Sequence, residues 1–161
     1  MQKPELVIFG FEGNISEVVA RRLAGHDTPL ILLRGKSAID DLLVYLQRTQ
    51  PYHILGLGEY SERDRDKLRI ETVCNNKFRN QYEGGARQQL RINTRLQPGE
   101  KMKMARGIGS LYCNLVSYRI MQLVVARRLQ PWYSFVHIPK SFDAMQAAEA
   151  IKLSLRQAKN L

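Results

Sequence analysis

The sequence has 161 residues, a net charge of +10 and 44% hydrophobic residues, the length and composition of one compact domain with a sizeable core. No apolar run approaches the roughly 20 residues of a membrane helix and nothing resembles a secretory signal, so composition excludes a membrane span and favours a cytoplasmic protein. Two cysteines, Cys74 and Cys113, are too few for a disulfide framework and are expected to be free thiols.

The first 58 residues alternate between strand-like and helix-like segments. Short apolar runs that end at a glycine or a turn are typical of strands buried on both faces of a sheet. Asn14 or Ser16 can cap the first helix, and Gly25 can end it. The predicted strands cover 5–10, 29–35 and 52–58, and the predicted helices cover 14–25 and 37–50. This alternation argues for an α/β protein with a mainly parallel sheet.

The middle of the chain, residues 61–105, does not continue this alternation of strands and helices. Residues 66–73 (DKLRIETV) and 88–96 (QQLRINTRL) alternate apolar and polar side chains with period two, so they predict a half-exposed antiparallel pair joined by the loop 75–86. The stretch KMKMARGIGS that follows predicts a weak strand and a turn.

The last third returns to the alternating pattern. A long helix is predicted over 111–130, ended by Pro131, with Arg127 and Arg128 complementing its C-terminal dipole. A buried strand follows at 133–139, and an amphipathic helix at 142–159. We therefore predict one α/β domain over residues 1–161, of the phosphorylase/hydrolase-like type, with a mainly parallel sheet flanked by helices and an antiparallel excursion at about 66–95.

Two residues of this last unit carry the candidate chemistry. Cys113 lies at the start of the long helix and His137 near the end of the strand that follows, and both positions belong to the carboxyl edge of a parallel sheet, where open α/β folds bind ligands. A thiol in the first turn of a helix has a lowered pKa, and a nearby histidine completes a cysteine nucleophile. The alternative is structural, since cysteine is among the most buried residue types.

The segments LYCNLVSY and FVHIP, which contain Cys113 and His137, closely resemble the nucleophile and histidine motifs of the pyroglutamyl peptidase I family, also called pyrrolidone carboxyl peptidases. GFEGNIS at 10–16 resembles the N-terminal motif of that family with several residues deleted. The resemblance spans nearly the whole chain and implies a shortened, divergent member. It implies that Cys113 attacks the scissile carbonyl, that His137 is its base, and that the N–H of Cys113 helps to hold the oxyanion.

The third catalytic residue of the family is a glutamate that orients the histidine. Matching the apolar alternation of RDKLRIE to the family places Asp66 at that position. A register shifted by one residue would place Lys67 there instead, and the acid would then come from one of three further carboxylates: Glu62, Asp64 or Glu71.

The resemblance also implies a substrate site for a pyroglutamyl ring. Phe11 matches one of the aromatic side chains that clamp the ring in the family, while the second belongs to the deleted segment. Asn14 aligns with the same N-terminal motif, and Leu57 lies in the segment GLGEYSER that corresponds to a substrate loop. The basic residue near the active site corresponds to Lys77 or Arg79.

The sequence therefore predicts a cysteine hydrolase that removes an N-terminal pyroglutamyl or related small acyl group from peptides through a thioester. We expect no cofactor and no metal, because Cys74, His26 and His53 lack partners at metal-ligand spacing. The resemblance suggests a homo-oligomer. The alternative is a catalytically degenerate binding protein for an acidic partner or nucleic acid, since residues 62–106 carry 12 Lys/Arg against 6 Asp/Glu. We do not favour it, because the sequence has no nucleic-acid-binding motif.

Overall fold

The computed structural model describes residues 3–61, 66–82, 84 and 88–159. A six-stranded sheet in the order β2-β1-β3-β10-β4-β9 forms its centre, and all neighbouring strands run parallel except β4 and β10. The strands of this sheet are β1 (Leu6–Phe11), β2 (Leu30–Leu33), β3 (His53–Tyr60), β4 (Leu68–Glu71), β9 (Met102–Ala105) and β10 (Trp132–Pro139). The predicted fold class is confirmed.

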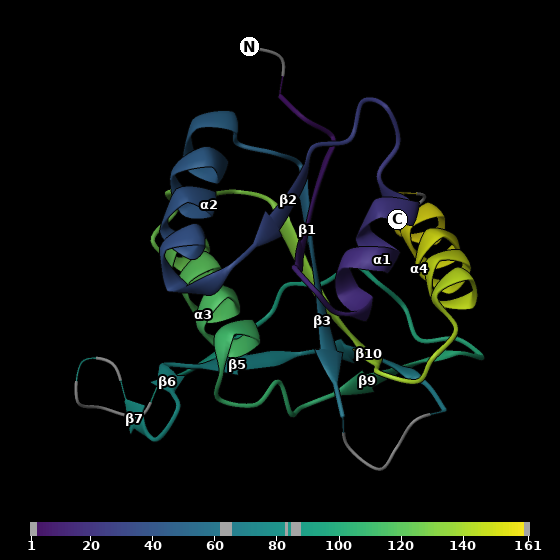
Figure 1. Ribbon diagram of the computed structural model, residues 1–161. Coiled ribbons are helices and arrows are strands. Elements are labelled where there is room, and N and C mark those ends of the chain that lie inside the picture. Colours follow the sequence, from purple (N-terminus) through teal and green to yellow (C-terminus); the bar gives the residue numbers. More distant parts are fainter. Residues whose placement is uncertain (1–2, 62–65, 83, 85–87, 160–161) are drawn as a thin grey trace.

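Within the described residues, four helices cover the two faces of the sheet (Figure 1). They are α1 (Ile15–Leu23), α2 (Gly35–Thr49), α3 (Tyr112–Val125) and α4 (Ala144–Lys159). Helices α2 and α3 pack on one face around the rings of Phe9 and Phe135. Helices α1 and α4 pack on the other face, against side chains such as Leu57 and Val136. The alternation along each strand therefore sorts its side chains between two separate cores.

The ends of the helices follow local capping chemistry. Asn14 caps α1, as predicted, because its Oδ1 accepts the N–H of Ser16 at 2.8 Å. Helix α3 is shorter than predicted, since it ends at Val125 and not near Pro131. The chain then turns through Arg127, whose φ is 55°, and buries Leu129 completely. The left-handed conformation of Arg127 accompanies this early end of the helix, so Arg127 and Arg128 lie beyond the helix and not in its last turn.

The antiparallel excursion is only partly as predicted. Strands β5 (Val73–Asn75) and β8 (Gln89–Arg91) do pair antiparallel, and the loop between them contains the short pair β6 (Lys77–Phe78) and β7 (Gln81–Tyr82). The segment before them, β4, instead joins the main sheet between β10 and β9. Its side chains Leu68 and Ile70 are fully buried in the core formed with α1 and α4, and this burial explains the difference.

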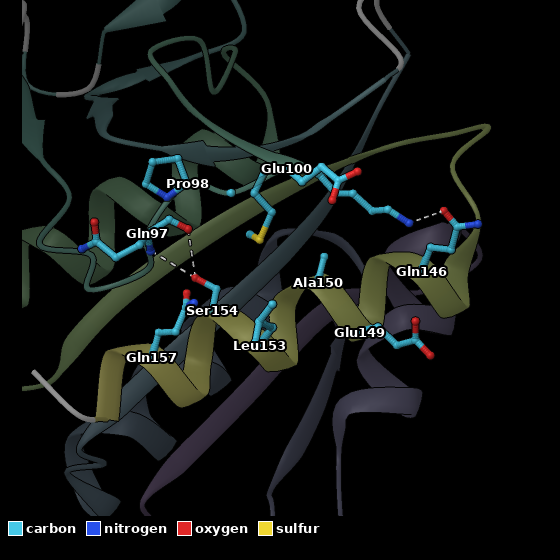
Figure 2. Close-up of a pocket in the computed structure, with 12 residues that line it drawn as sticks. Gln97, Pro98, Glu100, Gln146, Glu149, Ala150, Leu153, Ser154 and Gln157 are labelled. Carbon is cyan, nitrogen blue, oxygen red and sulfur yellow. Dashed lines mark hydrogen bonds between the residues drawn. The ribbon is translucent and has the colours of Figure 1, made fainter.

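Helix α4 is held against the segment that leads into β9 (Figure 2). The Ser154 hydroxyl accepts the N–H of Gln97 at 3.0 Å and donates to its carbonyl oxygen at 3.1 Å. Lys101 Nζ donates to Gln146 Oε1 at 2.8 Å at the other end of the helix. A cavity of about 280 Å³ lies between these two contacts. Within the described residues, no helix has the length and apolar character that crossing a membrane requires.

Candidate active site

Cys113 occupies the first turn of α3, where the predicted helix was expected to begin. The next residue, Asn114, is fully buried and fixes this end of the helix. Its Oδ1 accepts the N–H of Asn75 at 2.8 Å, and its Nδ2 donates to the carbonyls of Asn75 and Lys77. The amide of Asn114 therefore ties the turn that carries the thiol to β5 and β6. This explains why an asparagine follows the cysteine.

His137 and the Cys113 thiol both lie close to a glycine of the neighbouring strand. His137 lies opposite Gly58 in the parallel pairing of β10 and β3. A β-carbon built on Gly58 would lie 2.7 Å from Cys113 Sγ and 3.0 Å from His137 Cδ2. The two atoms thus both lie within 3.0 Å of one point. The prediction that Cys113 and His137 come together at the carboxyl edge of the sheet agrees with this geometry.

Because side chains in real proteins essentially never approach this closely, Gly58 is required for the site to form. We expect Gly58→Ala to displace the thiol or the imidazole and to slow any reaction that needs both groups by about tenfold or more, since small misplacements of reacting groups are costly. The matched control is Gly99→Ala, because no atom lies within 4 Å of a β-carbon at Gly99. Equal activity of the two variants in a steady-state assay would contradict this role of Gly58.

The carboxylate that contacts His137 is Glu71. Its Oε1 accepts a hydrogen bond from His137 Nδ1 at 2.8 Å, and its side chain is 0% exposed. Asp66, predicted at this position, is instead exposed in the turn before β4. The carboxylate beside His137 is thus Glu71 and not the predicted Asp66, and Glu71 is one of the three carboxylates that a shifted register would favour. Glu62 and Asp64 lie outside the described residues.

Further contacts hold the Glu71 carboxylate in place. Its Oε2 accepts the N–H of Gly107 at 3.0 Å, and Arg69 Nε lies 3.3 Å from Oε1. The Arg69 guanidinium also lies over the ring of Tyr60. The centre of the Tyr60 ring lies 5.9 Å from the centre of the His137 ring. A buried carboxylate needs such partners to remain ionised. Glu71 is therefore positioned to orient His137 with its Nδ1 proton toward the carboxylate and its Nε2 available.

The pKa of the Cys113 thiol is raised, whereas the sequence predicted that it would be lowered. Burial raises the pKa of Cys113 to about 12, and the negative charge of Glu71 acts in the same direction, while the backbone at the start of α3 acts to lower it. The helix terminus was expected to lower the pKa overall, but desolvation is the larger effect. Burial of Cys113 therefore favours the neutral thiol in the free protein.

The four predicted substrate residues occupy different surroundings. Phe11 is half-buried on the face of the sheet that carries Cys113. The centre of its ring lies 6.4 Å from the centre of the Phe9 ring. The side chain of Asn14 caps α1. Leu57 is fully buried in the opposite core, with α1 and α4, so its side chain does not face Cys113. Lys77 is half-buried, and its ammonium lies 5.7 Å from the ring of Tyr82.

The sequence analysis did not assign the observed roles of two residues of the site. Gly58 was interpreted as part of a strand and of the segment GLGEYSER, and Glu71 as one of several possible acids. The signal for Glu71 was its spacing from Leu68 and Ile70: since those two face α1 and α4, Glu71 must face the side of Cys113.

Comparison with solved structures identifies this architecture. The structure is similar to the pyroglutamyl peptidase I from Bacillus amyloliquefaciens with a TM-score of 0.77 at 17% sequence identity, covering 98% of this chain and 95% of that chain. It is equally similar to the pyrrolidone carboxyl peptidase from Thermococcus litoralis, with a TM-score of 0.77 at 16% identity over 99% and 94% of the two chains. The chain has the fold of the pyroglutamyl peptidases. A variant of the Pyrococcus furiosus enzyme gives the same TM-score of 0.77 at 17% identity.

No protein-family model matches the sequence, and no curated protein is similar to it by sequence comparison. At this identity the likeness concerns the pyroglutamyl peptidase fold, and the chemistry must be argued from the side chains of this chain.

Proposed function

We propose that this protein is a cysteine peptidase that removes an N-terminal pyroglutamyl group, or a related small acyl group, from peptides. The observation that carries the proposal is the convergence of Cys113 and His137 above Gly58, with Glu71 on the far nitrogen of the imidazole. The likeness to pyroglutamyl peptidases supports it, because those proteins share this fold over nearly the whole chain.

The first half of the reaction transfers the acyl group to the enzyme. The Cys113 thiol gives its proton to His137 Nε2 as its sulfur attacks the acyl carbonyl carbon. The negative charge that develops on the carbonyl oxygen is stabilised by N–H groups in the first turn of α3, which have no partners within the helix. The C–N bond then breaks, His137 returns the proton to the leaving amine, and a thioester on Cys113 remains.

The second half releases the acyl group. A water molecule gives a proton to His137 and attacks the thioester carbon, and the thiolate leaves and recovers the proton. Glu71 accepts a hydrogen bond from the Nδ1–H group throughout and stabilises the imidazolium that forms in each half. The neutral resting state of Cys113 makes this a general-base mechanism, in which the sulfur loses its proton only as it attacks.

The peptide substrate belongs to this proposal, as does a cytoplasmic location. Both cysteines are free, and a reducing compartment would keep the nucleophile in its thiol form. Phe11, on the face that carries Cys113, is the described aromatic side chain that we assign to the acyl ring.

A pyroglutamyl-anilide reporter tests the activity, and alkylation by iodoacetamide tests the nucleophile. We expect Cys113 to be alkylated faster than Cys74, which is 0% exposed. Since the pKa of Cys113 is about 12, its alkylation rate should rise about tenfold per pH unit from pH 7 to 10 without levelling off. Mass spectrometry of the two cysteine peptides measures both rates. Absence of cleavage together with equal alkylation of the two cysteines would overturn the proposal.

A further inference from the structure

A cavity of about 580 Å³ lies at the edge of the sheet opposite to Cys113. Leu6, His53 and Trp132 line it, and these are the first residues of the parallel strands β1, β3 and β10. The last turns of α4 form its wall. Its volume falls in the range of small-molecule sites. The cavity is therefore distinct from the carboxyl edge, where Cys113 and His137 meet.

Two exposed aromatic rings line this cavity. Trp132 is 41% exposed and Tyr52 is 58% exposed. The N–H of Trp132 donates to the Tyr52 carbonyl at 2.9 Å, so Trp132, the first residue of β10, lies beside the residue that precedes β3. A cation lies over each ring: the Arg95 guanidinium lies 4.2 Å from the centre of the Trp132 ring, and Lys3 Nζ lies 3.9 Å from the centre of the Tyr52 ring. Such large rings at a solvent-facing cavity offer surfaces for stacking.

The charge of the lining is strongly positive. Lys152, Arg156 and Lys159 follow at helical spacing along one face of α4, and all three are exposed. Arg95 adds a fourth cation, whereas the lining holds one acidic residue, Glu5, which pairs with Lys159 at 2.6 Å. His53 adds no charge near neutral pH, because burial and the charge of Arg95 lower its pKa to about 4. An anionic ligand would therefore complement this cavity.

The neighbouring cavity on α4 makes a useful contrast (Figure 2). Its lining contains Glu100, Glu149 and Lys101 and no aromatic side chain among the described residues. The combination of exposed rings and clustered cations thus distinguishes the cavity at the amino ends of the strands.

We propose that the cavity at Trp132 binds a nucleotide, either free or as a unit of a single-stranded nucleic acid. Stacking platforms beside basic side chains are the usual device for binding nucleotides without reading their sequence. The base would stack on Trp132 or Tyr52, and the phosphate would lie against Arg156 and Lys152. An acidic peptide would satisfy the charge but would leave both rings without a flat partner. The site goes beyond the proposed peptidase function and does not depend on it.

The single tryptophan of the chain provides a direct probe, because Trp132 is that residue. We expect its fluorescence to be quenched saturably by a nucleoside monophosphate or by a short oligothymidylate at low salt. Quenching by both indicates a free-nucleotide site, whereas quenching by the oligomer alone indicates a nucleotide within a strand. For the oligomer, raising the salt should weaken binding steeply. No quenching by either ligand would overturn the proposal, as would equal quenching by the uncharged nucleoside.

Variants separate this cavity from general electrostatic attraction. We expect Arg156→Glu to weaken binding about tenfold or more, while Arg48→Glu leaves it unchanged. Arg48 is exposed near the end of α2, on the other face of the sheet, and its replacement changes the net charge equally. Tyr52→Ala keeps the fluorescent probe and should weaken binding about tenfold if the ring takes part in stacking. Equal losses in Arg156→Glu and Arg48→Glu would overturn the proposal, and so would tighter binding of an acidic peptide than of the nucleotide.

Discussion

Cys113→Ser is expected to abolish the cleavage of a pyroglutamyl reporter, with a loss of about 10⁴-fold or more in kcat/KM. The serine hydroxyl is a far weaker nucleophile than a thiol that His137 deprotonates, and the larger sulfur fills the space above Gly58. Steady-state kinetics measure the loss. Circular dichroism and thermal unfolding establish that the variant still folds.

Cys74→Ser is the matched control for this substitution. Cys74 is fully buried in the core beside α3, its thiol donates to the carbonyl of Leu90 at 3.7 Å, and burial raises its pKa to about 12. A serine can keep that hydrogen bond, so Cys74→Ser should retain activity. Equal residual activity of the Cys113 and Cys74 variants would rule out Cys113 as the nucleophile.

Glu71→Gln is expected to lower kcat by about 10⁴-fold, the loss found when the orienting carboxylate of a catalytic triad becomes an amide. The glutamine amide would donate to His137 Nδ1, which would place the imidazole proton on Nε2 and prevent it from accepting the Cys113 proton. The negative charge that stabilises the imidazolium would also be lost.

Asp66→Asn separates the two candidate acids. Asp66 is exposed in the turn before β4, so its replacement should leave kcat within a factor of about two. A large loss in Asp66→Asn with full activity in Glu71→Gln would contradict the assignment of the orienting carboxylate to Glu71.

Strands β1, β2, β3 and β10 of the main sheet could be predicted from sequence because they are continuous apolar runs separated by amphipathic helices. The same signal is weak where one strand carries both charged and apolar residues. In β4, Arg69 and Glu71 alternate with Leu68 and Ile70, a pattern typical of a half-exposed strand. The charged side chains instead pair with each other and with His137, so tertiary contacts bury what local polarity predicts to be exposed.

The sequence predicted the proximity of Cys113 and His137 but not the position of Glu71, and the reason is the topology of the sheet. Cys113 and His137 belong to consecutive elements, α3 and β10, that run in opposite directions, so the start of α3 lies at the edge of the sheet where β10 ends. Glu71 reaches the site by an antiparallel insertion of β4 next to β10. Nothing in local periodicity specifies that insertion. The raised pKa of Cys113 could likewise not be predicted from sequence, because it depends mainly on the burial of the thiol and less on its position at the start of the helix.

The proposed mechanism requires that Cys113 carries the acyl group during turnover. A rapid acid quench of the enzyme while it cleaves a pyroglutamyl peptide, followed by mass spectrometry of its proteolytic fragments, tests this requirement. We predict a pyroglutamyl group on the fragment that contains Cys113, and its absence from the same fragment of Cys113→Ser. An unmodified Cys113 throughout turnover, or the acyl group on Cys74, would contradict the mechanism.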